Sequence, residues 1–377
     1  MASLNAPIRL FIGATLLGLG LPLTRLISPL EVGIGTDPNP VLAQETLAQT
    51  ELGTAPDYRG APPPPGGEPL PPERLRREVE PLPTDFRVPA LQPDYTGDLW
   101  VGTYLGLSRV DPNTGRLKAR VDLPNYTIDA LAQDLVGRIW LGTYEGLLRV
   151  DPRSNEVTAQ NFTLPSNRVL SLQVDRRGYL WVGSDRGLAM ISPDQGLLMT
   201  TVQELPGVSA NALTLDEEGQ LWVGTLEGLV QIDTKSAFIL RRIGNLPGTI
   251  VQSLTTGPDG KLWVGTPSSL LVIDPNNPFG EPRSVTPLRG RSVTAVRFAL
   301  DGSVWVGTER GLLKIRAETG AVLGELSNLP SDYILSLSPD VGNKLWVGTT
   351  EGLAWVSLST GQVRPHLAFV KNPPETF

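Results

Sequence analysis

The chain has 377 residues, with 32 basic and 39 acidic side chains, a net charge of −7, 40 Gly, 35 Pro, no Cys and a single His. The absence of Cys excludes disulfides, thiolate nucleophiles and sulfur-ligated zinc or iron, and one His leaves no His cluster for a metal. A net negative chain lacks the basic surface that binding to phosphate backbones requires, so nucleic acid is not expected as a partner.

An apolar run begins close to the N-terminus. Residues 10–23 (LFIGATLLGLGLPL) follow Arg9 and number fourteen, which is shorter than the ~20 residues that span a bilayer and is typical of a secretory signal. The sequence Val-Leu-Ala at 41–43 offers a cleavage site, although it lies far from the apolar run. We expect residues 1–43 to be a signal peptide and the protein to be periplasmic or extracellular. An uncleaved anchor and a soluble cytoplasmic product are the alternatives.

The composition of residues 44–72 then shifts to Pro and Gly, with PPPPGG at 62–67. Proline fixes φ and removes hydrogen-bond donors, so this stretch favours extended polyproline II over a packed core. We expect a disordered linker that acts as a spacer. A ligand for an SH3-like domain is the alternative.

A repeat of about 41 residues fills the rest of the chain. Trp recurs at seven positions that are 40 to 42 residues apart, in the phrases LWVGT, IWLGT, LWVGS and VWVGT; these are Trp100, Trp140, Trp181, Trp222, Trp263, Trp305 and Trp346. Gly stands two residues after each Trp, and Gly or Asn343 stands three residues before it. Gly and Asn tolerate positive φ, so the earlier position is the corner of a tight hairpin. Asp134, Asp175, Asp216 and Asp340 introduce that corner.

Turn signals divide each unit into four short strands. In the unit of Trp181, the expected strands are residues 169–174, 180–183, 188–192 and 198–204. Repeats of ~40 to 45 residues with four strands are typical of a β-propeller, and no unit shows helical periodicity. A single blade cannot bury both of its faces, so the repeats should fold together. We therefore predict an all-β fold, a seven-bladed β-propeller of four-stranded antiparallel blades, over residues 73–372.

The unit that begins with Leu-Pro at 164–165 and continues through Asp175, Gly178 and Trp181 to Gly187-Leu188 resembles the two-component regulator propeller repeat. The resemblance covers about residues 82–364. It implies a sensor-like domain outside the cytoplasm, as found in membrane histidine kinases and related regulators. These 377 residues contain no kinase or output domain, so we expect a stand-alone exported member. A WD40 propeller would fit the period, but its Gly-His and Trp-Asp dipeptides are missing.

Two segments compete to complete the last blade. Residues 74–83 align with the outer strand and exit of the first unit at 116–124, while residues 362–370 follow the seventh unit directly. We favour the local strand at 362–370, because its connection is a short hairpin with little loop entropy to lose.

Candidate chemistry is sparse. His366 lies in the last outer strand and is expected to be an ordinary surface residue. The Asp residues that end the third strands, such as Asp111 and Asp151, are interpreted as turn caps, and the repeated Thr after Trp-x-Gly as structural. No nucleophile, base and orienting group stand out, so no catalytic residue, metal or cofactor is expected.

A binding site should instead consist of residues that differ from one repeat to the next. In a propeller, the loops from the second to the third strand and the loops between blades emerge on one face. Aromatic and Arg side chains there suit recognition, and the candidates are Tyr104, Tyr126, Tyr144, Arg168, Arg186, Arg291, Arg310 and Tyr333. Tyr104, Tyr144, Arg168 and Arg186 are expected to form one patch.

We expect a non-catalytic propeller that binds a protein or glycan partner in the cell envelope, with membrane contact only through an uncleaved N-terminal segment. The alternative is a propeller enzyme similar to streptogramin lyase. The catalytic His and metal-bound acid pattern of that family is not found in this sequence.

Overall fold

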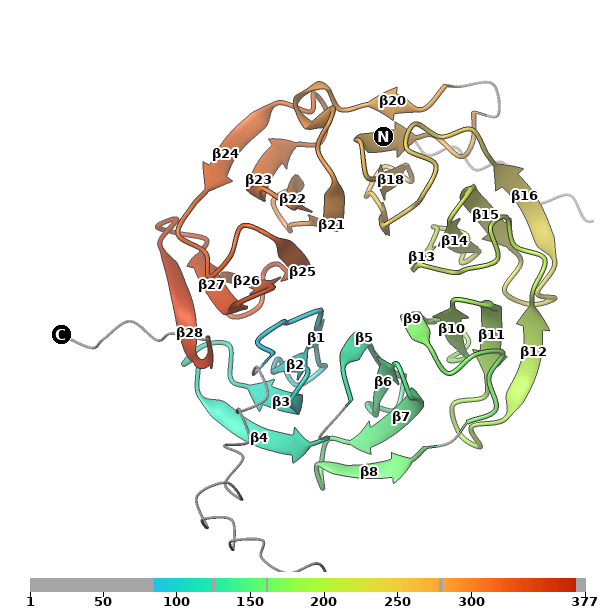
Figure 1. The fold of residues 1–377 in the computed structure, drawn as a ribbon, viewed down its shortest axis with the longest axis horizontal. Coiled ribbons are helices and arrows are strands. Elements are labelled where there is room, and N and C mark those ends of the chain that lie inside the picture. The colour runs from blue at the N-terminus through green and yellow to red at the C-terminus, as the bar shows by residue number, and fades with distance from the viewer. Residues whose placement is uncertain (1–84, 124–125, 161, 278–280, 371–377) are drawn as a thin grey trace, which may run out of the picture. The chain divides into compact units, whose positions relative to one another are not determined.

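The computed structural model describes residues 85–123, 126–160, 162–277 and 281–370. They form seven four-stranded antiparallel sheets in a ring, with the first strand of each sheet innermost (Figure 1). The all-β, seven-bladed fold predicted from the repeat is confirmed. The expected signal at 1–43 and linker at 44–72 lie outside the described residues, as do residues 73–84 and 371–372 of the expected propeller.

Each blade takes four consecutive strands. Those of the first four blades are β1 (Ala90–Pro93), β2 (Leu99–Thr103), β3 (Gly106–Val110), β4 (Leu117–Asp122), β5 (Ile128–Gln133), β6 (Ile139–Thr143), β7 (Gly146–Asp151), β8 (Glu156–Ala159), β9 (Val169–Val174), β10 (Leu180–Ser184), β11 (Gly187–Ile191), β12 (Leu198–Val202), β13 (Ala212–Leu215), β14 (Leu221–Thr225), β15 (Gly228–Ile232) and β16 (Ile239–Ile243). Those of the last three are β17 (Ser253–Thr256), β18 (Leu262–Gly265), β19 (Leu270–Ile273), β20 (Arg283–Ser284), β21 (Val293–Phe298), β22 (Ser303–Thr308), β23 (Gly311–Arg316), β24 (Val322–Leu326), β25 (Ile334–Ser338), β26 (Lys344–Thr349), β27 (Gly352–Ser357) and β28 (Val363–Val370), with the 3-10 helix η2 (Thr286–Leu288) after β20.

The hairpin before each Trp depends on positive φ. Gly178 has a φ of 91° and Asn343 a φ of 55°, as the sequence predicts. Residues with a Cβ adopt this region at a cost, which explains why only Gly and Asn occupy the corner.

The repeated Trp fills the space between neighbouring blades. Trp181 is fully buried and packs in one apolar cluster with Leu205, Leu221 and Val223 of the next blade. The Gly two residues later is required by the same packing. A Cβ at Gly183 would lie 2.4 Å from the carbonyl oxygen of Ala210, so a side chain there would push the two blades apart.

The repeated polar residues are structural, as expected. The Asp111 carboxylate accepts a hydrogen bond from the backbone N–H of Asn113 at 2.9 Å and so caps the turn after β3. The Thr143 hydroxyl donates to the carbonyl of Gly146 at 2.9 Å and accepts from the N–H of Glu145 at 3.1 Å, which closes the loop between β6 and β7.

The last blade is completed locally. β28 pairs with β27, so the expectation of a local outer strand is confirmed, and the competing segment at 74–83 lies outside the described residues. Blade 7 then meets blade 1 through hydrogen bonds, including Ser336 Oγ to the Val88 carbonyl at 2.8 Å and the Val88 N–H to the Thr349 carbonyl at 3.0 Å.

His366 is not the surface residue that the sequence suggested. Its side chain is buried, its Nε2 lies 2.7 Å from the carbonyl oxygen of Gly115 in blade 1, and its ring packs near Trp346 and Phe369. The prediction was wrong because outer strands are normally exposed, whereas this one covers the junction between the last and first blades.

Within the described part of the chain, no helix has the length and hydrophobicity needed to cross a bilayer.

Candidate functional site

Two sets of loops meet on one face of the ring, which we call the loop face. It comprises the loops between the second and third strands and the connections between blades. In blade 7 the N–H of Thr350, from the first set, donates to the carbonyl of Tyr333, from the second, at 3.2 Å. The shared face predicted from the topology is therefore present.

Tyr144 and Arg168 form the clearest pair on the loop face. The Arg168 guanidinium lies over the Tyr144 ring, with its carbon 4.7 Å from the ring centre. Tyr144 comes from the loop between β6 and β7 and is 51% exposed, while Arg168 comes from the connection before β9 and is also exposed. Such stacking orders a long cationic side chain and leaves its N–H groups free to bind.

The other predicted residues lie apart from this pair. The Tyr333 hydroxyl lies 3.4 Å from a Glu309 carboxylate oxygen, and Arg291 pairs with Glu325 at 3.4 Å. Arg186 and Arg310 are exposed on their loops.

Two tyrosines are less exposed than expected. Tyr126 packs against the apolar cluster between blades 1 and 2, and Tyr104 is half-buried. The ring contacts of the described residues include none between Tyr104 and Tyr144. The four-residue patch stays a prediction.

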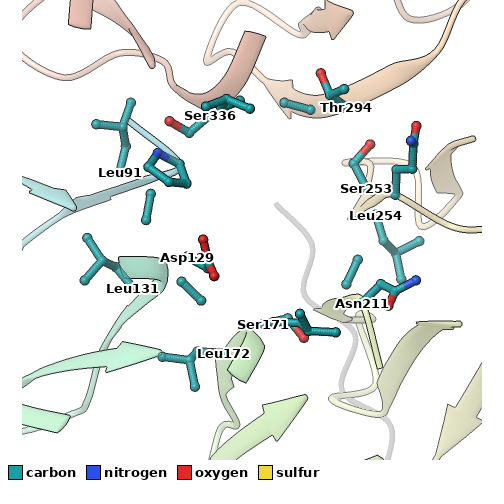
Figure 2. Close-up of a pocket in the computed structure, with 18 of the residues that line it drawn as sticks. Leu91, Asp129, Leu131, Ser171, Leu172, Asn211, Ser253, Leu254, Thr294 and Ser336 are labelled. Atoms are coloured by element: carbon teal, nitrogen blue, oxygen red, sulfur yellow. The ribbon is translucent and has the colours of Figure 1, made fainter. Parts of the chain in front are cut away.

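A cavity of about 180 Å³ lies at the centre of the ring and is lined by the inner strands (Figure 2). Near the loop face, the seven blades contribute one residue each at an equivalent position, just before a small residue of the inner strand. These are Pro89, Asp129, Leu170, Asn211, Gln252, Thr294 and Leu335. We call them the mouth ring.

Asp129 supplies the acidic group of the mouth ring. Figure 2 shows its carboxylate directed into the opening. Burial raises its pKa to about 6, while the positive charges of Arg87 and Arg168 act in the opposite direction. Arg168 therefore links the exposed pair with Tyr144 to the mouth of the cavity.

The mouth ring was missed because residues that differ between repeats were considered only in the loops. A signal was present, since the residues on either side of the ring repeat in every blade, as Val, Ile or Ala before it and Ala or Ser after it. Between these two positions, the mouth-ring residue varies from Pro to Asp, Asn and Gln. In the described part of the chain, no group of three or more His, Asp and Glu residues could hold a metal ion.

Comparison with known families matches residues 163–186 to the family described as Two component regulator propeller. This segment belongs to one copy of the repeat of about 41 residues, so the match falls within one of the seven units. The matched repeat runs from the connection before β9 to the loop after β10, so it includes Arg168, Trp181 and Arg186. A comparison of the sequence with curated proteins found no match.

Solved structures share the propeller fold. An extracellular domain assigned to a hybrid two component system of B. thetaiotaomicron is 19% identical, with a TM-score of 0.62, over 73% of this chain and 39% of that one. A second, assigned to a one component system of the same organism, is 20% identical, with a TM-score of 0.53, over 74% and 48%. This chain thus spans less than half of the length of either.

An enzyme also shares the fold. A catalytically inactive virginiamycin B lyase from Staphylococcus aureus, solved with quinupristin, is 16% identical, with a TM-score of 0.61, over 71% of this chain and 94% of that one. At such identities the likeness concerns the fold, and function has to be argued from the site.

Proposed function

We propose that this chain is an exported, non-catalytic propeller that binds a protein or glycan partner of the cell envelope through its loop face. The observation that supports this best is the stacked pair of Tyr144 and Arg168. An exposed aromatic ring offers a large contact area with few rotatable bonds, and an Arg fork binds carboxylate or hydroxyl oxygens. Both side chains are presented by short loops on a rigid ring.

The residue that follows the repeated Thr or Ser differs between blades, and Tyr occurs there only at Tyr104 and Tyr144. The loop position of Tyr144 is occupied by Asp185 and Leu226 in the next two blades. No property of the fold requires an aromatic residue at this place, because the loop is closed by the hydroxyl of Thr143 and the carbonyl of Gly146. Recognition is therefore the better explanation for the exposed ring.

Catalysis is the weaker alternative. The one His of the chain, His366, lies in the outermost strand of blade 7 and contacts Gly115, whereas the cavity is lined by inner strands. General acid and base chemistry needs a titratable pair within hydrogen-bond reach of one substrate. Asp129 is the carboxylate among the residues that line the cavity, and the His is not among them.

The test compares partner capture by matched variants. The chain and a Tyr144→Ser, Arg168→Gln variant are immobilised and exposed to envelope extract and to a glycan array. Exposed loop changes usually alter stability by less than ~0.5 kcal/mol, whereas loss of an interface anchor weakens binding at least about tenfold. The loss should therefore appear in capture and not in the melting curve.

An Asp111→Asn, Asp151→Asn variant is the control, because these side chains cap turns at the opposite end of the blades. It should bind as the unmodified chain does. Equal capture by all three proteins would show that the loop face is not the binding surface. Turnover of a lactone or glycan by the purified chain would favour the enzyme instead.

A further inference from the structure

Most polar residues of the mouth ring are already used to join neighbouring blades. Asn211 Nδ2 donates to the Val251 carbonyl at 3.2 Å, and Thr294 Oγ1 donates to the Ile334 carbonyl at 2.6 Å. The Gln252 side-chain oxygen accepts from the Ser292 hydroxyl at 3.1 Å. These groups have structural partners and need no ligand.

Two charged groups of the cavity have no such role. Among the described residues, Asp129 makes no hydrogen bond or ion pair. Arg297 donates to the carbonyl of its own neighbour, Val296, at 2.9 Å and pairs with no carboxylate of the described chain. Arg297 is partly exposed in the cavity, and desolvation of its guanidinium by the surrounding wall lowers its pKa. Unpaired charges in such surroundings are costly unless a partner offsets them.

The register of the strands places the two charges at different depths. Ala130 pairs with Gly142 in blade 2, and Ala295 pairs with Gly307 in blade 6, so Asp129 and Thr294 occupy equivalent positions. Arg297 lies three residues beyond Thr294 in β21. It is therefore three residues deeper in the cavity than Asp129. At ~3.3 Å per residue the difference in depth is about 10 Å.

An apolar zone separates the two levels. The inner strands place Leu residues along the cavity wall two residues beyond the mouth ring: Leu91, Leu131, Leu172 and Leu213 are half-buried, whereas Leu254 and Leu337 are buried. Figure 2 shows Leu91, Leu131, Leu172 and Leu254 around the opening. From the loop face inward, the cavity thus offers the carboxyl group of Asp129, a belt of Leu residues and the guanidinium cation of Arg297.

We propose that this cavity binds a small amphoteric molecule, with its cationic end at Asp129, its apolar middle against the Leu belt and its anionic end at Arg297. A short peptide with free termini has this chemistry, because three extended residues span ~10 Å. This small ligand is distinct from the macromolecular partner proposed for the loop face.

Binding of the cationic end is coupled to a proton. The groups facing Asp129 from neighbouring elements are Arg87 and Arg168, and Tyr144 lies beside them. Burial keeps part of the Asp129 population protonated below pH ~6. An ammonium group beside the carboxylate favours its ionised form, so the complex should release a proton when it forms at about pH 5.5.

Isothermal titration calorimetry with the tripeptide alanyl-leucyl-alanine tests the proposal on the full chain. The free tripeptide should bind, and N-acetylation or C-amidation should each weaken binding at least about tenfold, since each removes a charge-assisted hydrogen bond. At about pH 5.5 the heat should differ between buffers of different ionisation enthalpy, which reports the released proton.

Variants assign each end of the ligand. Asp129→Asn should bind the free and acetylated peptides alike, and Arg297→Gln should bind the free and amidated peptides alike. Asp111→Asn is the control, because this carboxylate caps an exposed turn, and it should keep both preferences. The proposal is overturned if the free peptide does not bind at millimolar concentration, if the blocked peptides bind equally well, or if the Asp129 and Asp111 variants behave alike while their melting curves match.

Discussion

Asp216 holds the indole of Trp222 in place: its Oδ2 accepts a hydrogen bond from the Trp222 ring nitrogen at 2.9 Å, six residues along the chain. The same bond joins Asp94 to Trp100 and Asp134 to Trp140. In blades 5 and 6 the Asp is replaced by Gly257 and Ala299, and the indole nitrogens of those blades are buried without a hydrogen-bond partner.

Replacing Asp216 with Ala should lower the free energy of unfolding by about 3 kcal/mol. The carboxylate also accepts hydrogen bonds from the Gln220 N–H and the Gln231 side chain, and each buried donor left without an acceptor costs ~1 to 3 kcal/mol. Denaturant unfolding measures the change. Asp111→Ala, which removes an exposed turn cap, should cost far less. Equal losses in the two variants would mean that the Asp and Trp pairs do not determine stability.

Truncation of the Trp between two blades should lower the free energy of unfolding by more than the loss of Asp216 does. Trp181→Ala removes a fully buried side chain from the cluster between blades 3 and 4, and such substitutions cost ~3 to 5 kcal/mol. Thermal and denaturant melts measure the loss. Trp355, which is half-buried beside β28, provides the control, and its replacement by Ala should have a smaller effect. An unchanged melt of the Trp181 variant would contradict the packing described here.

The raised pKa of Asp129 predicts a stability that falls as the pH rises. The native carboxyl holds its proton up to about pH 6, whereas the unfolded one loses it near 3.8, so the native state binds more protons in that interval. Unfolding midpoints measured from pH 4 to 6.5 should show this decline. Asp129→Asn should remove that part of the decline. An identical profile for the variant would mean that Asp129 is ionised in the native state throughout.

For His366 we expect the opposite dependence of stability on pH. Burial lowers its pKa below the usual 6.5, so just below pH 6.5 the unfolded state binds a proton that the native state does not. This group therefore favours unfolding as the pH falls. His366→Gln, which can still donate to the Gly115 carbonyl, should flatten the loss of stability below pH 6.5. NMR titration of the single His gives its pKa directly, and a value at or above 6.5 would exclude this source of acid sensitivity.

The repeat allowed most of the fold to be predicted. Trp181, Gly183 and Gly178 each reflect a local requirement, either a filled gap, a close approach or a positive φ, and local requirements recur visibly along a sequence. His366 was misjudged because its partner Gly115 lies 251 residues away. Asp129 was missed for a different reason: binding residues were expected in the loops, whereas Asp129 belongs to the inner strand β5 and lines the cavity.

Within residues 85–370, as far as the structure describes them, the ring is closed by hydrogen bonds and apolar packing between blade 7 and blade 1. All four strands of blade 7 come from one continuous stretch, and contacts such as Ser336 with Val88 and His366 with Gly115 join it to blade 1. Each sheet of the propeller therefore consists of four consecutive strands, and the junction between blades 7 and 1 is the one that no connecting loop of the described chain crosses. Under mechanical tension, unfolding should begin at that junction, and the order of blades could be permuted circularly without breaking any sheet.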